Sequence, residues 1–155
     1  MSAPARLDCV VDASVGIKLC VPEPDSDLAD RLFALAAGSP PVELHVPDLF
    51  YIECANILWK RVLRSGHRAS QAESDIQHLC SLRLHRTPTA DLALEALRIA
   101  LAHAVTAYDA SYVALSARLG LRLVTADDAL IRNLAGTPFN LVRLADLPLP
   151  APPAP

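Results

Sequence analysis

Short apolar segments alternate along this chain with longer segments of helical periodicity, and this alternation is the strongest constraint on its fold. The strand-like segments are 7–11, 43–46, 82–85, 121–124 and 140–143. Short strands that alternate with helices are typical of an α/β fold in which helices cover both faces of a parallel sheet. The 155 residues are enough for one domain of this kind.

Local sequence features place helices between these strands. Helices are expected over residues 14–20, 27–37, 48–64, 70–81, 91–102, 107–119 and 127–134. Thr106 is the predicted N-cap of the helix 107–119, and Gly120 follows it where a left-handed residue commonly ends a helix. Residues 1–146 therefore form one predicted domain.

The C-terminal segment 147–155, LPLPAPPAP, differs in composition from the rest of the chain. Its prolines lack the backbone N–H that a helix or a sheet ladder needs, so the segment is expected to be extended, in polyproline-II-like conformation or without order. We expect this proline-rich tail to take no part in the fold.

The composition excludes several classes of protein. Hydrophobic residues make up 52% of the chain and the mean hydropathy is +0.29, which argues against disorder. No apolar run approaches the roughly 18 residues of a membrane span, and the N-terminus lacks the features of a signal peptide. A cytoplasmic protein without a membrane association is expected. The formal net charge of −3 disfavours a broad nucleic-acid-coating surface.

The cysteines support the same compartment. Cys9, Cys20, Cys54 and Cys80 are widely spaced, lie in apolar segments and form no CxxC pair. A chain of this size does not need disulfides to be stable. All four are therefore expected to be reduced thiols in the core.

Four acidic residues, far apart in the sequence, are expected at one edge of the sheet. Asp12 follows the first strand and Asp127 follows the strand 121–124. Glu53 and Asp109 lie near the starts of helices, whose N-termini point to the same edge after right-handed crossovers. Ligands of parallel α/β sheets bind beyond the carboxyl ends of the strands.

Four clustered carboxylates repel each other and need a counter-charge. Mg²⁺ binds oxygen ligands and is typically held by one or two carboxylates together with waters and substrate phosphates. The four acids are therefore a candidate site for one or two Mg²⁺ or Mn²⁺ ions. Such ions activate a water molecule and stabilise the leaving oxygen in phosphodiester hydrolysis.

Structural explanations remain open for each aspartate. Asp12 and Asp109 could cap or support the helices that follow them, and Thr125-Ala-Asp-Asp128 fits a capping box. Glu53 lies too deep in its helix to be a cap. Of the adjacent pair, Asp127 is assigned to the metal site and Asp128 to helix capping.

These residues lie in segments that resemble the PIN domain family, and within it the VapC-type toxins of toxin–antitoxin pairs. The matching segments are VVDASVGIKL, LFYIECANILWK and TAYDASYVALSARLGLRLVTADDAL, and the resemblance covers roughly residues 7–146. It implies a PIN-like three-layer α/β/α sandwich with a central parallel sheet. The acids Asp12, Glu53, Asp109 and Asp127 match the family's catalytic, metal-binding positions. Ser14, Asn56 and Thr125 match polar positions that would orient the carboxylates, and Asn56 could instead contact the substrate.

The resemblance also implies an activity and partners. Members of the family are Mg²⁺- or Mn²⁺-dependent endoribonucleases, and the VapC-type toxins cut RNA such as tRNA or rRNA and so inhibit translation. A cognate antitoxin protein holds them inactive, and they commonly form homodimers. The alternative is a catalytically weak PIN-like module that binds RNA or protein. A receiver or phosphotransfer domain is disfavoured because Asp12-Ala-Ser14 lacks the second aspartate of a DxDxT-like motif, and no phosphate-binding glycine motif is present.

Overall fold

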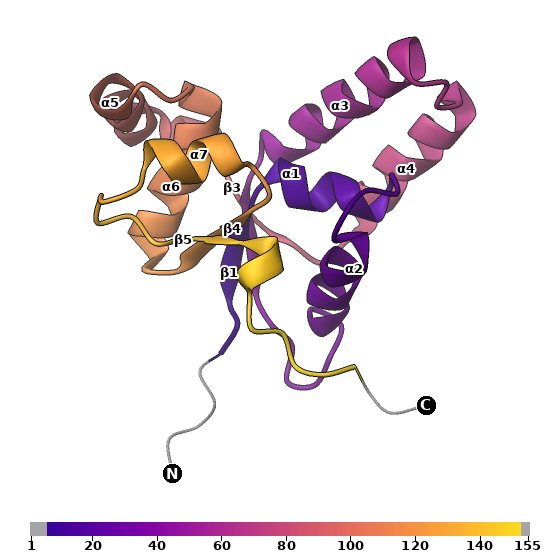
Figure 1. The fold of residues 1–155 in the computed structure, drawn as a ribbon, viewed down its shortest axis with the longest axis horizontal. Helices are drawn as coiled ribbons and strands as arrows, with labels where there is room; N and C mark the ends of the chain where they lie inside the picture. Colours follow the sequence, from indigo (N-terminus) through magenta and orange to yellow (C-terminus); the bar gives the residue numbers. More distant parts are fainter. Residues whose placement is uncertain (1–5, 153–155) are drawn as a thin grey trace.

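The computed structural model describes residues 6–152, and its centre is a five-stranded sheet (Figure 1). The strands are β1 (Cys9–Val11), β2 (Leu44–Pro47), β3 (His85–Thr87), β4 (Arg122–Thr125) and β5 (Leu141–Arg143). Their order across the sheet is β3-β2-β1-β4-β5, and every neighbouring pair is parallel. The expected parallel sheet is therefore confirmed.

Helices cover both faces of this sheet. They are α1 (Ala13–Gly16), α2 (Ser26–Leu35), α3 (Phe50–Arg64), α4 (Ala69–Ser81), α5 (Ala93–His103), α6 (Ala107–Leu119) and α7 (Asp128–Asn133). Helices α1 to α4 lie on one side of the sheet, and α5 and α6 lie on the other (Figure 1). Because both faces are covered, the central strand β1 is wholly apolar and wholly buried. The arrangement is the expected three-layer α/β/α sandwich.

The strand order creates one point where ligands of such sheets commonly bind. From β1 the chain first extends the sheet through β2 and β3, and it then returns to add β4 and β5 on the other side of β1. The direction of winding therefore reverses between β1 and β4. A crevice opens outside the carboxyl ends of the strands at such a reversal, and Asp12 and Asp127 lie just beyond the ends of these two strands.

Helix α1 contacts α3 because residue 16 is a glycine. A Cβ atom at Gly16 would overlap the ring of Phe50, which is fully buried at the start of α3. The close approach brings the segment after Asp12 against the helix that carries Glu53.

Several helices and strands begin at residues other than the predicted ones. The edge strand β3 begins at His85, three residues after the expected start, and its exposed residues lack the apolar character of a central strand. Helix α4 begins at Ala69, one residue before its expected start. Helix α3 begins at Phe50 rather than at Asp48, whose Oδ1 accepts a hydrogen bond from the backbone N–H of Thr89.

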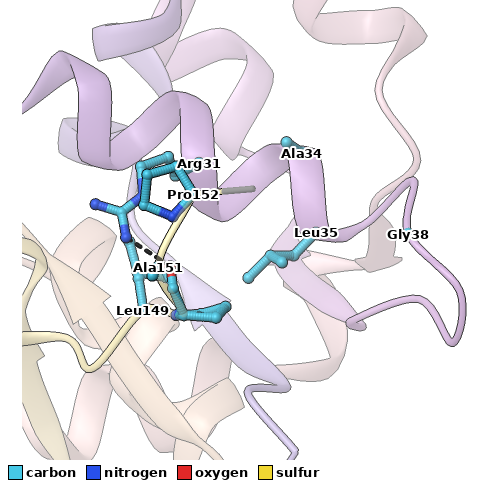
Figure 2. Close-up of a pocket in the computed structure, with 8 residues that line it drawn as sticks. Arg31, Ala34, Leu35, Gly38, Leu149, Ala151 and Pro152 are labelled. Carbon is cyan, nitrogen blue, oxygen red and sulfur yellow. Dashed lines mark hydrogen bonds between the residues drawn. The ribbon is translucent and has the colours of Figure 1, made fainter. Parts of the chain in front are cut away.

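The expectation of an uninvolved tail is wrong for its first residues. Leu147 is buried in the core, Leu149 packs against it, and the Arg31 guanidinium donates a hydrogen bond to the carbonyl oxygen of Pro150 at 2.6 Å. Figure 2 shows this segment lying against α2, where it lines a shallow pocket with Leu35. Residues 153–155 lie outside the described part of the chain. Residues 148–152 have neither helix nor strand, as expected.

Two further expectations can be compared with the structure. Cys9 and Cys54 are buried thiols, as expected, but Cys20 is only partly buried and Cys80 on α4 is exposed, so the expectation of four core thiols is wrong. Within residues 6–152, none of the helices is both long enough and apolar enough to cross a membrane.

Candidate active site

Asp12 lies at the carboxyl end of β1 and is buried with only 4% of its surface exposed. Although it occupies the N-cap position of α1, its side chain makes no capping hydrogen bond. Its Oδ2 instead accepts hydrogen bonds from the hydroxyls of Ser14 and Thr125, each at 2.7 Å. The position of Asp12 in the sequence suggests a cap, but its contacts are those of an oriented carboxylate.

Ser14 and Thr125 also connect the ends of β1 and β4. The Ser14 Oγ accepts a hydrogen bond from the backbone N–H of Ala126 at 3.0 Å, and the Thr125 Oγ1 accepts one from the N–H of Asp127 at the same distance. The two hydroxyl oxygens are 3.3 Å apart. These bonds support the predicted roles of Ser14 and Thr125 in orienting carboxylates.

The capping role that the sequence assigns to Asp128 belongs to Asp127 in the structure. Asp127 is the N-cap of α7, because its Oδ1 accepts hydrogen bonds from the backbone N–H groups of Ala129 and Leu130 at 2.8 and 3.1 Å. Asp128 is exposed and forms an ion pair with Arg143. The assignment of capping to Asp128 is therefore wrong, since the first turn of α7 starts one residue later than expected.

Asp109 occupies the first turn of α6 and has a local partner there. The backbone N–H of Asp109 donates to the Thr106 Oγ1 at 3.1 Å, and the Thr106 hydroxyl donates to the Asp109 Oδ2 at 2.7 Å. This confirms Thr106 as the N-cap of α6. The same bond holds one oxygen of Asp109 at the end of the sheet where Asp12 lies.

Glu53 projects from the first turn of α3 and contacts a residue that sequence reasoning missed. The hydroxyl of Tyr112, on α6, donates a hydrogen bond to the Glu53 Oε1 at 2.8 Å. Tyr112 is fully buried, and burial together with the charges of Asp12 and Glu53 raises its pKa, so the hydroxyl remains a donor. A buried tyrosine within an apolar helix needs a hydrogen-bond partner, but the sequence does not indicate which distant residue supplies it.

Asn56 is less closely associated with the acids. It is exposed on α3, one turn after Glu53, and among the residues that the structure describes its side chain has no hydrogen-bond partner. Its expected role in orienting a carboxylate has no contact to support it, so contact with a substrate is the better remaining interpretation.

The acids influence one another electrostatically. Burial raises the pKa of Asp12; the Ser14 and Thr125 hydrogen bonds oppose this, and the charges of Asp109 and Asp127 add to it. Burial also raises the pKa of Glu53 to about 7, with the Tyr112 bond lowering it and Asp12 and Asp109 raising it. The pKa of Asp109 is raised by burial and by Asp127 against the effect of Thr106. All four carboxylates therefore belong to one electrostatic cluster.

Each acid is held through a single oxygen. The Asp12 Oδ2, the Glu53 Oε1, the Asp109 Oδ2 and the Asp127 Oδ1 accept the hydrogen bonds described above. In residues 6–152 the second oxygen of each carboxylate has no hydrogen-bond partner, and no unpartnered side-chain polar atom is fully enclosed. One oxygen of every acid, including that of buried Asp12, is thus free and accessible.

This arrangement fits a divalent cation, although the ligand set is not preassembled. None of the ion pairs in the described part of the chain includes any of the four acids, so their charge lacks a protein counter-ion. In the same residues, no group of three or more acidic, histidine or cysteine side chains forms a ready-made metal site. Mg²⁺ requires only one or two protein carboxylates with water, and the free oxygens meet this requirement.

Comparisons with known proteins agree with the fold. Residues 9–136 match the PIN domain. The chain is 40% identical over 122 residues to Ribonuclease VapC3 of Pyrobaculum aerophilum. The aligned region covers 76% of this chain and 88% of the relative.

Two solved structures have the same architecture. PAE2754 from Pyrobaculum aerophilum superimposes with a TM-score of 0.63 at 25% identity, over 90% of this chain and 92% of its own. A toxin–antitoxin complex from Klebsiella pneumoniae contains a chain with a TM-score of 0.62 at 17% identity, covering 90% of this chain and 100% of that one. The second likeness shows the fold alone.

Proposed function

Because the chain belongs to the PIN domain family, we propose that it is a metal-dependent endoribonuclease and the toxin of a toxin–antitoxin pair. One observation supports the proposal above all: four acids near the strand reversal influence one another electrostatically, and each has one oxygen held by the protein and one without a hydrogen-bond partner among residues 6–152. The 40% identical relative is a ribonuclease, and the shared residues span most of both chains.

In this proposal Asp12, Glu53, Asp109 and Asp127 hold Mg²⁺ or Mn²⁺. The ion, when bound, supplies an activated water and stabilises charge on the leaving oxygen. The protein's own part is to orient the carboxylates through Ser14, Thr125 and Thr106. The fixed carboxylates also repel one another, and this favours binding of a cation over the free state.

A cleavage assay with a matched pair of variants tests this function. Asp12→Asn removes a charge but keeps the size and the hydrogen-bond acceptor, and it should abolish Mn²⁺-dependent cleavage of RNA with folding intact. Asp30→Asn makes the same change on the exposed side of α2 and should leave cleavage unchanged. Cleavage that persists in Asp12→Asn or in excess chelator would identify a contaminating ribonuclease and contradict the proposal.

The proposed substrate is structured RNA of the translation apparatus, tRNA or rRNA, in the cytoplasm. Positive charge for its phosphates comes from exposed residues at the end of α3 and the start of α4, namely Lys60, Arg64 and Arg68. Lys18 and Arg61 are less available because both form ion pairs with Glu23. Expression in cells followed by mapping of new RNA 5′ ends would identify the target.

The proposed protein partners are a cognate antitoxin and a second copy of the chain. Two helices each present a row of exposed apolar residues: Ile52, Trp59 and Leu63 on α3, and Leu94, Leu97 and Leu101 on α5. The two helices lie on opposite sides of the sheet (Figure 1). Rows of exposed apolar side chains of this kind mark interaction sites. In this proposal the second copy and the antitoxin cover these two rows.

The alternative function, a weakly catalytic module that binds RNA or protein, is distinguished by metal titration. A module needs no charge at Asp109, so its Mn²⁺ binding would be absent or unchanged by Asp109→Asn. The endoribonuclease requires that Mn²⁺ binding weakens in this variant. The substituted amide still accepts the Thr106 hydroxyl bond, so the helix start is preserved.

A further inference from the structure

Tyr112 is the buried group at the acidic cluster that the proposed mechanism does not use. It lies on α6 one turn after Asp109, so the two residues share a face of the helix. Its side chain is fully buried, and its hydroxyl reaches across to the Glu53 Oε1 on α3 at 2.8 Å. The bond therefore joins the two helices that carry the two acids not located at strand ends.

Glu53 depends on this bond more than the other acids depend on theirs. Asp12 is held by two hydroxyls, Asp127 by two backbone N–H groups, and Asp109 by a residue of its own helix. Glu53 has the longest side chain of the four and, in the described part of the chain, only Tyr112 as a side-chain partner. Holding a glutamate side chain in one of its several rotamers costs conformational entropy, so a hydrogen bond is needed to keep it there.

We propose that Tyr112 is a positioning residue for the metal site, acting through Glu53. By donating to Oε1 it selects one orientation of the carboxylate and leaves Oε2 directed to the ion that the four acids would hold. A residue that hydrogen-bonds to a ligating carboxylate in this way typically changes metal affinity by about 10- to 100-fold. This inference rests on the proposed metal-dependent function.

Tyr112→Phe tests the proposal with little disturbance of packing, because only the hydroxyl is lost. Mn²⁺ affinity, measured by electron paramagnetic resonance or calorimetry on the full chain, should fall by about tenfold or more. Tyr51→Phe is the matched control, since Tyr51 is a partly buried tyrosine on α3 that packs edge-on against Phe50. Mn²⁺ affinity should remain that of the wild-type protein in this control.

A double-mutant cycle separates positioning from a purely structural role. In a Glu53→Ala background there is no carboxylate left to orient, so adding Tyr112→Phe should cause no further loss of Mn²⁺ affinity. An equal additional loss in that background would overturn the proposal, as would unchanged affinity in the folded single variant. If Tyr112→Phe fails to fold alone, the double variant is compared with Glu53→Ala, because in that background the Tyr112 hydroxyl has already lost its Glu53 partner: equal Mn²⁺ affinity of the two supports the proposal, and a further loss overturns it.

The same measurements keep this inference distinct from the ribonuclease proposal. Wild-type protein that binds Mn²⁺ tightly and loses this binding in Tyr112→Phe, but cuts no RNA, would support the positioning role and contradict the ribonuclease. RNA cleavage that disappears in Asp12→Asn, together with unchanged Mn²⁺ affinity in Tyr112→Phe, would support the ribonuclease and contradict the positioning role. A wild-type protein without Mn²⁺ binding would overturn both.

Discussion

Thr125 donates its hydroxyl to the carboxylate of Asp12 across 2.7 Å, and both residues are buried where β4 and β1 end. The bond lies at the reversal of strand order and so connects the two halves of the sheet at the acidic edge. Its consequences for binding and for stability can be measured separately.

Thr125→Val keeps the shape of the side chain and removes the hydroxyl. Asp12 loses one of two donors and the N–H of Asp127 loses its acceptor, so the free energy of unfolding should fall by about 1–3 kcal/mol. Mn²⁺ affinity should fall by about tenfold. Urea unfolding and Mn²⁺ titration check the two effects, and Thr125→Ser should restore both. Failure of serine to restore affinity would indicate that packing, rather than the hydroxyl, is responsible.

Asp127 has two functions that different substitutions can separate. Asn caps helices about as well as Asp, so Asp127→Asn should keep the stability of α7 but weaken Mn²⁺ binding. Asp127→Ala should lose both, with a stability cost of about 1 kcal/mol. Thermal unfolding and Mn²⁺ titration of the two variants provide the comparison.

Asp128→Asn is the neighbouring control. Asp128 is exposed and its Arg143 ion pair is on the surface, where such pairs contribute little to stability. Both stability and Mn²⁺ affinity should remain close to those of the wild-type protein. A loss of Mn²⁺ binding equal to that of Asp127→Asn would show that the two aspartates share the site.

The acidic cluster should make the metal-free protein less stable as pH rises. Burial raises the pKa of Glu53 from 4.5 to about 7, and the pKa values of Asp12 and Asp109 are also raised. Between pH 4.5 and about pH 7, the folded protein keeps a proton on Glu53 that the unfolded chain has lost. The free energy of unfolding therefore falls as the pH rises through this window. Thermal melts in chelator at about pH 5 and about pH 8 should show this fall.

Added Mg²⁺ should reverse this trend, because it binds the ionised carboxylates only in the folded state. The gain in melting temperature should be large at the higher pH and small at the lower one. A Glu53→Gln variant removes one of the raised pKa values and should show a smaller dependence on pH. An equal gain at both pH values would mean that the ion binds elsewhere.

The first residues of the C-terminal tail should contribute to stability. Leu147→Ala removes a buried side chain and should lower the free energy of unfolding by about 2 kcal/mol or more. Pro148→Ala, at an exposed neighbouring position, is the control and should have little effect. Denaturant unfolding of both variants distinguishes a tail that packs from one that does not.

The exposed apolar residues of α3 and α5 predict a concentration-dependent dimer. Trp59→Glu or Leu101→Glu places a charge within a surface that is apolar and 56% or 78% exposed in the single chain. Either variant should shift the protein to a monomer in analytical ultracentrifugation while its circular dichroism stays unchanged. A wild-type protein that remains monomeric at high concentration would contradict the dimer, and leave these residues for another partner.

The sequence was most informative where the determinants are local. Thr106 and Gly120 were correctly predicted to bound α6, because a cap and a left-handed residue act on adjacent backbone. The assembly of the sheet and the common edge of Asp12 and Asp127 follow from general rules for parallel strands. These features required no knowledge of distant contacts.

Other features depend on contacts that the sequence does not specify. The Tyr112–Glu53 bond joins residues 59 positions apart, so it could not be predicted from either neighbourhood. Asp127 and Asp128 both fit a cap by type, and only the true start of α7 and the position of Arg143 distinguish them. Leu147 and Leu149 appeared to belong to a proline-rich tail because their contacts lie elsewhere in the fold.

The order of the strands also sets when the acidic edge can form during synthesis. Asp12 and Thr125 are separated by 113 positions, and β1 can pair with β4 only after the residues between them have been made. Pairings between such distant segments form late in folding. A nascent chain still attached to the ribosome, with β4 inside the exit tunnel, therefore exposes Asp12 and Glu53 without the residues that complete their surroundings. The acidic edge is thus completed only after β4 has left the exit tunnel.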